Sequence, residues 1–320
     1  MGLIATVRRR VLTPNVSDTK VAVRGFHVKS PAACDLLETI GASFVDGYAR
    51  AAEARTPADA EPGLDTVPTR FRGFAYEGAA MGFAVRDGLP FGGGLVRQLL
   101  DGAGDRHVYM AYVGVGWAMA RLPRFRWASL YAPDPLLRWL VMDGYGFHQA
   151  YFRTQRYVHE QYRETDFPYP PGAPHPYANR GIDQGIGRAL WFVGGTSVEH
   201  VHRLIQAFPA ERRPDLYSGV GLAATYAGGA DRGELRDLVR RAEQYQPHLS
   251  QGSAFAASAR ARAGLIVPHN DLGTEVLCGM STTEAAAICD LTRPAADEDN
   301  EMPAYELWRR RVRREFGAPR

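Results

Sequence analysis

The 320-residue sequence predicts an all-α fold, a superhelix or curled array of about seven helical hairpins preceded by a short N-terminal arm. Three observations predict it. A phrase centred on glycine returns at near-equal intervals, and segments with helical apolar spacing follow most of its copies. The composition, 45% hydrophobic and 23% charged, is that of a chain that buries a substantial core.

Each copy of the phrase has a small residue or a tyrosine two positions after its central residue. The seven central residues are Gly47, Gly78, Gly114, Gln149, Gly185, Gly219 and Gly252, at intervals of 31, 36, 35, 36, 34 and 33 residues. Glycine costs a helix about 1 kcal/mol relative to alanine, so its return needs a reason. Close approach of neighbouring helices in a stacked array supplies one, and we expect the phrase on the inner helix of each hairpin.

The second helices of the hairpins are expected at residues 95–101, 135–142, 198–208, 234–244 and 282–290. Ser281 and Glu284 form a capping-box pattern at the start of the last segment. The period of about 34–36 residues is similar to that of tetratricopeptide repeats, although the consensus of that family is not met. The array is expected to occupy residues 41–320.

Three segments depart from the repeat. Residues 164–178 form a proline-rich insertion in which five prolines preclude a helix. It is either an excursion or a lid, and as a lid it would pack Phe167, Tyr169 or Tyr177 near His148. Residues 1–40 are expected to form an arm with a short strand, because residues 20–28 alternate in polarity. Residues 303–316 are expected to form a basic helix that caps the last repeat.

Composition excludes several function classes. The net charge is +3 and the arginines are scattered among carboxylates, which indicates solvated helix faces rather than a nucleic-acid surface. Three cysteines fit neither a paired disulfide framework nor a zinc pattern, which favours a reducing compartment. No apolar stretch has the length of a membrane span. We therefore expect a cytoplasmic protein without a membrane span, metal or cofactor.

Equivalent positions in an array line one surface, so the columns around the central residue predict the site. The column just before it reads Asp46, Glu77, Val113, His148, Gln184, Ser218, Gln251, and the column before that reads Val45, Tyr76, Tyr112, Phe147, Asp183, Tyr217, Ser250. Aromatic walls with sparse polar groups are typical of a small-molecule site. The predicted ligand-binding residues are Asp46, Tyr76, Tyr112, Phe147, Gln184, Tyr217, Ser218 and Gln251. The alternative is that these polar groups only bond neighbouring helices.

Three members of these columns, Glu77, His148 and Asp183, are the candidate catalytic residues because they can exchange protons. Adjacent helices lie roughly 8–10 Å apart, so His148 and Asp183 are expected to share a site. Glu77 would join them only in a strongly curved array. A separate acidic run at residues 297–301 is either a solvated linker or a site for Mg²⁺ or alkene protonation, as in isoprenoid enzymes.

Phrases at residues 74–81, 113–123, 143–148, 218–223, 251–257 and 303–308 resemble the domain-of-unknown-function family 1702, also called UnbL-type proteins. The likeness runs from about residue 5 to 316. Such proteins accompany enediyne polyketide synthases, so the resemblance implies a role in forming or handling a polyene-derived core. It assigns no residue a function.

The expected function is to bind an apolar polyene-type intermediate of natural-product biosynthesis in the concave face and to assist its cyclisation, isomerisation or modification. A polyketide synthase or another biosynthetic enzyme is the expected protein partner. Two alternatives stay open. One is a non-catalytic scaffold or carrier for biosynthetic proteins, and the other is a terpene-cyclase-like enzyme.

Overall fold

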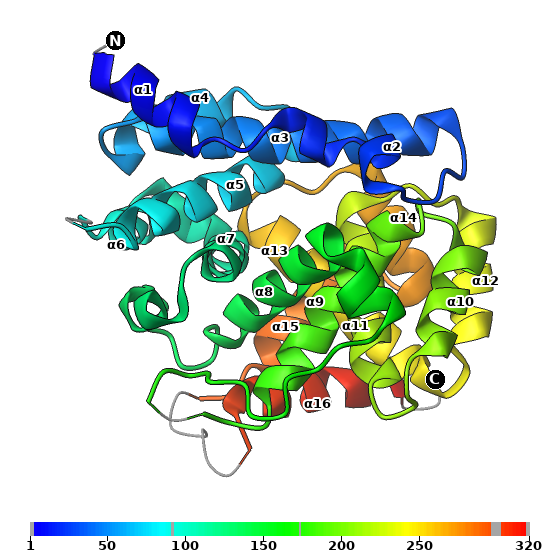
Figure 1. The fold of residues 1–320 in the computed structure, drawn as a ribbon. Helices are drawn as coiled ribbons and strands as arrows, with labels where there is room; N and C mark the ends of the chain where they lie inside the picture. The colour runs from blue at the N-terminus through cyan, green and yellow to red at the C-terminus, as the bar shows by residue number, and fades with distance from the viewer. Residues whose placement is uncertain (1–2, 91–92, 173, 296–301, 318–320) are drawn as a thin grey trace.

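The computed structural model describes residues 3–90, 93–172, 174–295 and 302–317 (Figure 1). Over these residues the regular structure is entirely helical and contains no strand, which confirms the all-α prediction. In the same ranges no helix combines the length and the apolar character needed to cross a bilayer. The acidic run at residues 297–301 lies outside the described residues.

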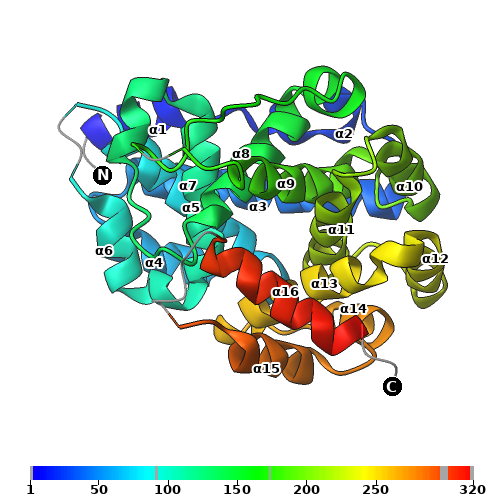
Figure 2. The same ribbon diagram turned by 90° about the horizontal axis from the view of Figure 1, so that it is seen from below.

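Most helices form two rows. In the inner row each helix packs on the next. Its members are α3 (Pro31–Glu53), α5 (Thr69–Asp87), α7 (Val108–Arg121), α8 (Trp139–Phe152), α9 (Ala178–Val193), α11 (Arg213–Ala227), α13 (Gln246–Arg262) and α15 (Thr282–Thr292). The outer row holds α4 (Pro57–Asp65), α6 (Leu95–Asp101), α10 (Val198–Ala207), α12 (Arg232–Ala242) and α14 (Pro268–Leu277). The basic helix α16 (Ala304–Gly317) packs on α13 and α15 as the predicted cap (Figure 2).

Two of the expected second helices belong to the inner row. Residues 282–290 fall in α15, which packs on α13. Residues 135–142 form a turn that leads into α8, because the Asp134 carboxylate accepts hydrogen bonds from the backbone N–H groups of Leu136 and Leu137 and so starts the helical turn. Only the short η3 (Arg124–Ser129) separates α7 from this turn.

Glycines mark the lines along which inner helices touch. A Cβ atom added to Gly78, Gly114, Gly144, Gly185, Gly219 or Gly252 would overlap a backbone carbonyl oxygen of the preceding inner helix. The glycine that does this in α8 is Gly144, five residues before the predicted Gln149. Near-equal spacing misplaced the fourth repeat because α7 joins α8 without an outer helix, whereas the proline-rich insertion lengthens the next connection.

The N-terminal arm contains α1 (Leu3–Leu12), η1 (Val16–Thr19) and α2 (Val21–Arg24) instead of the expected strand. Gly25 ends α2 in the left-handed conformation, with φ of 66°. The array also begins earlier than residue 41. Pro31 stands at the start of α3 and the Ser30 side chain accepts the N–H of Ala33, which fixes the first turn there.

The proline-rich segment packs against the rest of the protein, but it does not cover His148. Phe167 stacks on Trp127 with ring centroids 5.5 Å apart. The Tyr169 hydroxyl donates to the Arg138 carbonyl at 2.9 Å, and the Tyr177 hydroxyl donates to Glu306 at 3.0 Å. None of the residues that the structure describes in this segment lines the pocket that contains His148. The predicted lid is therefore wrong, because the buried rings hold this segment against η3, the start of α8 and α16.

Candidate functional site

The inner row curves until its second helix meets its fifth, sixth and seventh. The Glu77 carboxylate on α5 lies 3.7 Å from the Arg188 guanidinium on α9. Phe74 of α5 meets Tyr226 of α11 edge-on at 5.1 Å. Arg260 of α13 donates to the Arg70 carbonyl at 3.0 Å. This is the strongly curved form in which Glu77 can join a shared site.

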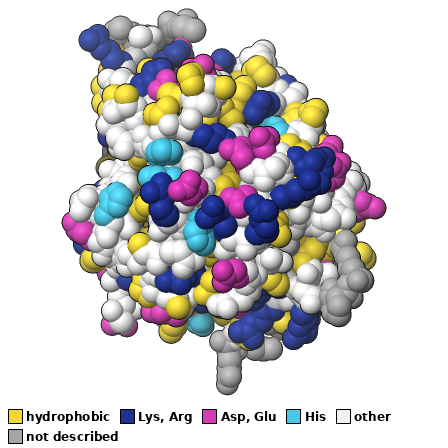
Figure 3. All heavy atoms as spheres, turned by 90° about the vertical axis from the view of Figure 1, so that its right-hand side faces the viewer, with side chains coloured by type: hydrophobic (Ala, Val, Ile, Leu, Met, Phe, Trp, Pro, Cys, Tyr) yellow, Lys and Arg dark blue, Asp and Glu magenta, His cyan; other side chains and the backbone are white. Residues whose placement is uncertain are grey.

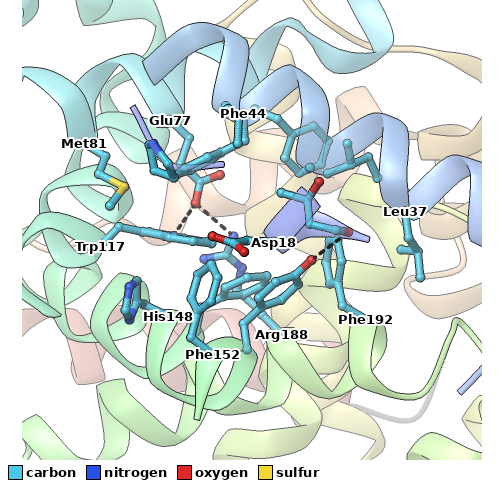
Figure 4. A pocket seen from close by; sticks show the side chains of 18 of the residues that line it. Asp18, Leu37, Phe44, Glu77, Met81, Trp117, His148, Phe152, Arg188 and Phe192 are labelled. Carbon is cyan, nitrogen blue, oxygen red and sulfur yellow. Dashed lines mark hydrogen bonds and ion pairs between the residues drawn. The ribbon is translucent and has the colours of Figure 1, made fainter. Parts of the chain in front are cut away.

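The curvature encloses an apolar cavity of about 60 Å³ between α3, α5, α7, α8 and α9 (Figure 4). The N-terminal arm covers it with Pro14, Asn15, Asp18 and Thr19, so the cover is η1 and the turn before it. Its walls are mainly apolar and aromatic: Leu37, Ile40, Phe44, Val45, Phe74, Met81, Trp117, Phe147, Tyr151, Phe152 and Phe192. Its ionisable lining side chains besides Asp18 and Tyr151 are Glu77, Arg121, His148 and Arg188. We call this the aromatic pocket.

Trp117 is the central wall of the aromatic pocket. Its ring centroid lies 4.4 Å from that of Phe44 and 5.1 Å from that of Phe147. Its indole N–H donates to Glu77 Oε1 at 3.0 Å, and His148 meets the same ring edge-on at 5.5 Å. The indole thus contacts both Glu77 and His148 (Figure 4).

Glu77 is a buried acid that is still partly protonated near neutral pH. Only 2% of its accessible surface is exposed. Burial, with a smaller contribution from the Asp143 carboxylate, raises the pKa of Glu77, and the charge of Arg188 and the Trp117 N–H lower it, so that the resulting pKa is about 7. Arg188 makes its closer ion pair with Asp143, which leaves Glu77 as the weaker partner. The site therefore holds a carboxyl group suited to both donating and accepting a proton.

His148 supplies a neutral imidazole to the same pocket. Burial lowers the pKa of His148 to about 3, and Arg121 adds to that effect. Its Nδ1 atom is buried and has no hydrogen-bond partner among the described residues. At neutral pH this ring carries no charge, and its Nδ1 atom has an unused hydrogen-bonding position.

Asp183 does not share this site. It accepts from Arg212 Nη2 at 2.6 Å and from Arg212 Nε at 3.1 Å, and both side chains are buried. The pair lines a separate small cavity beside Tyr145 and Tyr157. The prediction that His148 and Asp183 share a site is wrong, and Glu77 is the residue that joins His148. Asp183 lies two positions before its glycine, on the side of α9 that faces away from the aromatic pocket.

The predicted tyrosine wall also faces the outer side of the array. Tyr76 donates to Asp65 at 2.9 Å, Tyr112 accepts from the Asp134 N–H at 3.1 Å, and Tyr217 donates to the Arg241 carbonyl at 3.2 Å. Asp46 is half exposed and pairs with Arg50 at 2.7 Å. None of these four predicted ligand residues lines the aromatic pocket, whereas Phe147 does.

The remaining predicted ligand residues form a buried polar chain that we call the polar spine. Gln184 donates to Asp143 at 2.7 Å, and the Ser218 hydroxyl reaches Gln184 at 3.4 Å and Gln251 at 2.9 Å. Arg309 of α16 donates to Gln251 at 3.2 Å. With Gly144 as the fourth central residue, Asp143 takes the place of His148 in this column. These contacts fit the alternative in which the polar column bonds neighbouring helices.

The sequence interpretation missed a column that lines the pocket. The third residue after each contact glycine reads Met81, Trp117, Phe147, Arg188, Leu222 and Phe255. The first four line the aromatic pocket, and Arg188 and the last two line a second apolar cavity of about 40 Å³. Positions −1 and +3 are four apart and share one helix face, so the correct register would have found this column.

Within the described ranges, no three His, Cys, Asp or Glu side chains are placed to hold a metal ion. No curated protein and no solved structure matches the chain. A family model does match, over residues 3–316, and its description is "Protein of unknown function (DUF1702)". This match spans almost the whole chain and agrees with the resemblance carried by the repeated phrases. The chain belongs to this family of proteins of unknown function.

Proposed function

We propose that the protein binds an elongated, apolar, unsaturated molecule in the aromatic pocket and moves a proton on it, as an isomerase or cyclase. One observation carries the proposal: a carboxyl with a pKa of about 7 lies in a pocket whose other walls are mostly aromatic. Apolar burial favours a hydrocarbon ligand, and aromatic faces stabilise a cationic intermediate. Glu77 is the proposed acid.

Proton movement in this scheme is balanced. The Glu77 O–H bond breaks as its proton bonds to an alkene carbon, and the positive charge left on the ligand faces Trp117, Phe147 and their neighbours. Arg188 stabilises the carboxylate that forms. A C–H proton then passes to the neutral His148 or back to Glu77, which leaves the double bond shifted or a ring closed.

Ligand entry requires the cover to move. A cavity of about 60 Å³ holds only a few water molecules, whereas ligand sites commonly reach about 300 Å³ or more. The Tyr151 hydroxyl donates to the Thr19 carbonyl at 3.3 Å, and Lys20 pairs with Glu38 at 2.6 Å on the surface. These attachments are one buried hydrogen bond and one surface ion pair, so we expect displacement of residues 14–20 to cost less than opening the core.

The family resemblance supplies the biological setting of the proposal. In that setting the ligand is a polyene-type intermediate of enediyne polyketide or related natural-product biosynthesis, and the protein acts in the cytoplasm beside the synthase that makes it. A second candidate function uses the same pocket without chemistry. The side chains of the polar spine already bond to one another between neighbouring helices, so they are not available to a ligand. This favours a carrier of apolar ligands in which Glu77 and His148 only shape the cavity.

A proton-exchange experiment separates the two. A conjugated tetraene fatty acid is incubated with the protein in D₂O, and deuterium content and double-bond positions are read by mass spectrometry. We expect the wild type to exchange and isomerise the probe, and Glu77→Gln to bind it without exchange. Exchange by Glu77→Gln at the wild-type rate would remove Glu77 from the chemistry. Binding without exchange by both proteins would favour the carrier.

A further inference from the structure

Helix α16 and the first turn of α13 border a shallow hollow on the surface, wide open to solvent, with a volume of about 540 Å³. It is lined by Pro247, His248, Arg310, Arg313, Arg314 and Gly317. None of these residues lines the aromatic pocket, so an inference about this hollow does not depend on the proposed function. Figure 2 shows α16 lying across the lower side of the array, and Figure 3 shows basic side chains gathered near the lower edge of one face.

Positive charge around this hollow exceeds the negative charge available to balance it. Four guanidinium groups lie within 4 Å of Glu306, at 3.1 Å for Arg180, 3.4 Å for Arg309, 3.1 Å for Arg310 and 2.8 Å for Arg313. Asp215 takes further contacts from Arg180 and Arg309 at 2.9 and 2.7 Å. Arg314 pairs with no carboxylate of the described residues. Five cations thus face two anions, which leaves an excess of three positive charges.

This positive potential shifts the pKa values of neighbouring groups. The arginines hold the pKa of Glu306 down to about 2 although the side chain is buried. Burial, followed by Arg313 and Arg309, lowers the pKa of His248 to about 4, so its ring is neutral at pH 7. A protonated His248 would add one more positive charge to a cluster that already has too many.

The wall of the hollow also holds hydrogen-bonding atoms without partners. Arg313 Nη1 and His248 Nδ1 are buried and bond to nothing among the described residues. The hollow adjoins the start of α13, whose first N–H groups face away from the helix and favour negative charge. No acidic side chain is among its described lining residues. A shallow surface that is cationic and rich in donors, like this one, suits a small oxyanion whose oxygen atoms accept from guanidinium groups.

We propose that the hollow between α13 and α16 binds a phosphate-type anion, carried as the phosphate or diphosphate group of a small molecule. Arg314 and Arg313 would supply guanidinium donors, and Arg310 would add charge at the rim. Guanidinium groups match the geometry of phosphate oxygens, and a bound dianion would neutralise two of the three excess charges.

The test is calorimetric titration of the full-length protein with pyrophosphate and with inorganic phosphate, at constant ionic strength set by chloride. Arg314→Gln removes a guanidinium that makes no ion pair with the part of the chain that the structure describes. Arg236→Gln is the matched control, because Arg236 is exposed on α12 and does not line the hollow. We expect saturable binding to the wild type and to Arg236→Gln, and an affinity weakened about tenfold in Arg314→Gln.

Absence of saturable binding to the wild type would overturn the proposal. Equal weakening by Arg314→Gln and Arg236→Gln would also overturn it, because it would show attraction to the overall charge rather than to the hollow. Thermal melts of both variants, expected to match the wild type, show that any loss of binding is not a loss of folding.

Discussion

Arg188 contacts two buried carboxylates, Asp143 closely and Glu77 at a longer distance. This difference decides which of the two carboxyl groups is ionised. Asp143 takes the closer ion pair and also accepts from Gln184, so it stays part of the polar spine. Glu77 has one indole N–H at 3.0 Å and the guanidinium at 3.7 Å. A single cation cannot fully compensate two buried anions, so the less favoured carboxyl keeps its proton.

The raised pKa of Glu77 predicts a pH dependence of stability. Its pKa is about 7 in the folded protein and 4.5 in the unfolded chain. The folded state therefore holds one extra proton between these values, and the free energy of unfolding falls as the pH rises from 4.5 to 7. The loss is about 3 kcal/mol. Glu77→Gln should lack this loss, which urea unfolding of both proteins at pH 5 and pH 7.5 would show. Parallel pH profiles would contradict it.

Asp183 is expected to be structural. Asp183→Asn leaves the Arg212 guanidinium buried without its anion, so the variant should lose about 3–5 kcal/mol of stability. Asp46→Asn breaks only a half-exposed pair and should lose less than about 1 kcal/mol. Chemical denaturation of the two variants measures the difference. An Asp183→Asn protein as stable as the wild type would contradict this account.

The sequence predicted individual site residues unevenly. Glu77, Phe147 and His148 lie in the aromatic pocket, although His148 entered the list through a wrong register. Trp117 and Arg188 were missed because residues after the central glycine were not compared between repeats. Arg212 could not have been assigned to Asp183 from spacing, because that pair depends on how the loop before α11 folds back.

At the scale of the element, contact glycines set how closely inner helices approach. In Gly185→Ala the new methyl group would overlap the Asp143 carbonyl oxygen, so α8 and α9 must separate. We expect a loss of about 2 kcal/mol or more. Gly233 lies in the exposed first turn of α12, and only the Asp231 carboxylate at 3.3 Å is near its added methyl. Gly233→Ala should leave stability unchanged or raise it by up to about 1 kcal/mol.

Urea unfolding of the two glycine variants tests this prediction. Equal effects of the two substitutions would contradict the role assigned to the contact glycines. A further check is a crystal structure of Gly185→Ala, in which the distance between the axes of α8 and α9 should be larger than in the wild type.

Helix identity was predictable because glycine periodicity and apolar spacing are local signals. Residues 95–101 match α6, and the expected cap at residues 303–316 differs from α16 by one residue at each end. The alternating polarity of residues 20–28 led to a wrong prediction of a strand, because a segment this short has too few positions to distinguish a strand from one helical turn. The prediction of the connection between α7 and α8 was wrong because the length of this connection was inferred from the average period.

At the scale of the whole molecule, long-range contacts join helices near the two ends of the inner row. Arg260 of α13 is fully buried and donates to the backbone carbonyls of Arg70 and Tyr226, at 3.0 and 2.6 Å. The bond to Arg70 joins residues 190 positions apart in the chain, and the bond to Tyr226 joins residues 34 positions apart. A repeat period fixes the number of helices but not the angle between successive ones, so this closure could not be read from the sequence.

Closure also explains where the pocket lies and what covers it. Only a strongly curved row brings α5 and α9 close enough for Glu77 and Arg188 to meet. The remaining opening is covered by the N-terminal arm, where Thr19 lies against Gly41 of α3. That the arm covers the site could not be predicted from the sequence, because a segment outside the repeat has no register that positions it.

The central claim is that the aromatic pocket takes an elongated apolar ligand, and a fluorescence titration with a conjugated tetraene fatty acid tests it most directly. Val45→Phe places a ring in the pocket, whereas Val23→Phe changes a valine that is 56% exposed and lines no pocket. We predict saturable binding to the wild type and to Val23→Phe, and an affinity about tenfold weaker for Val45→Phe at an unchanged melting temperature. Equal affinities in all three proteins, or no binding to the wild type, would contradict the claim.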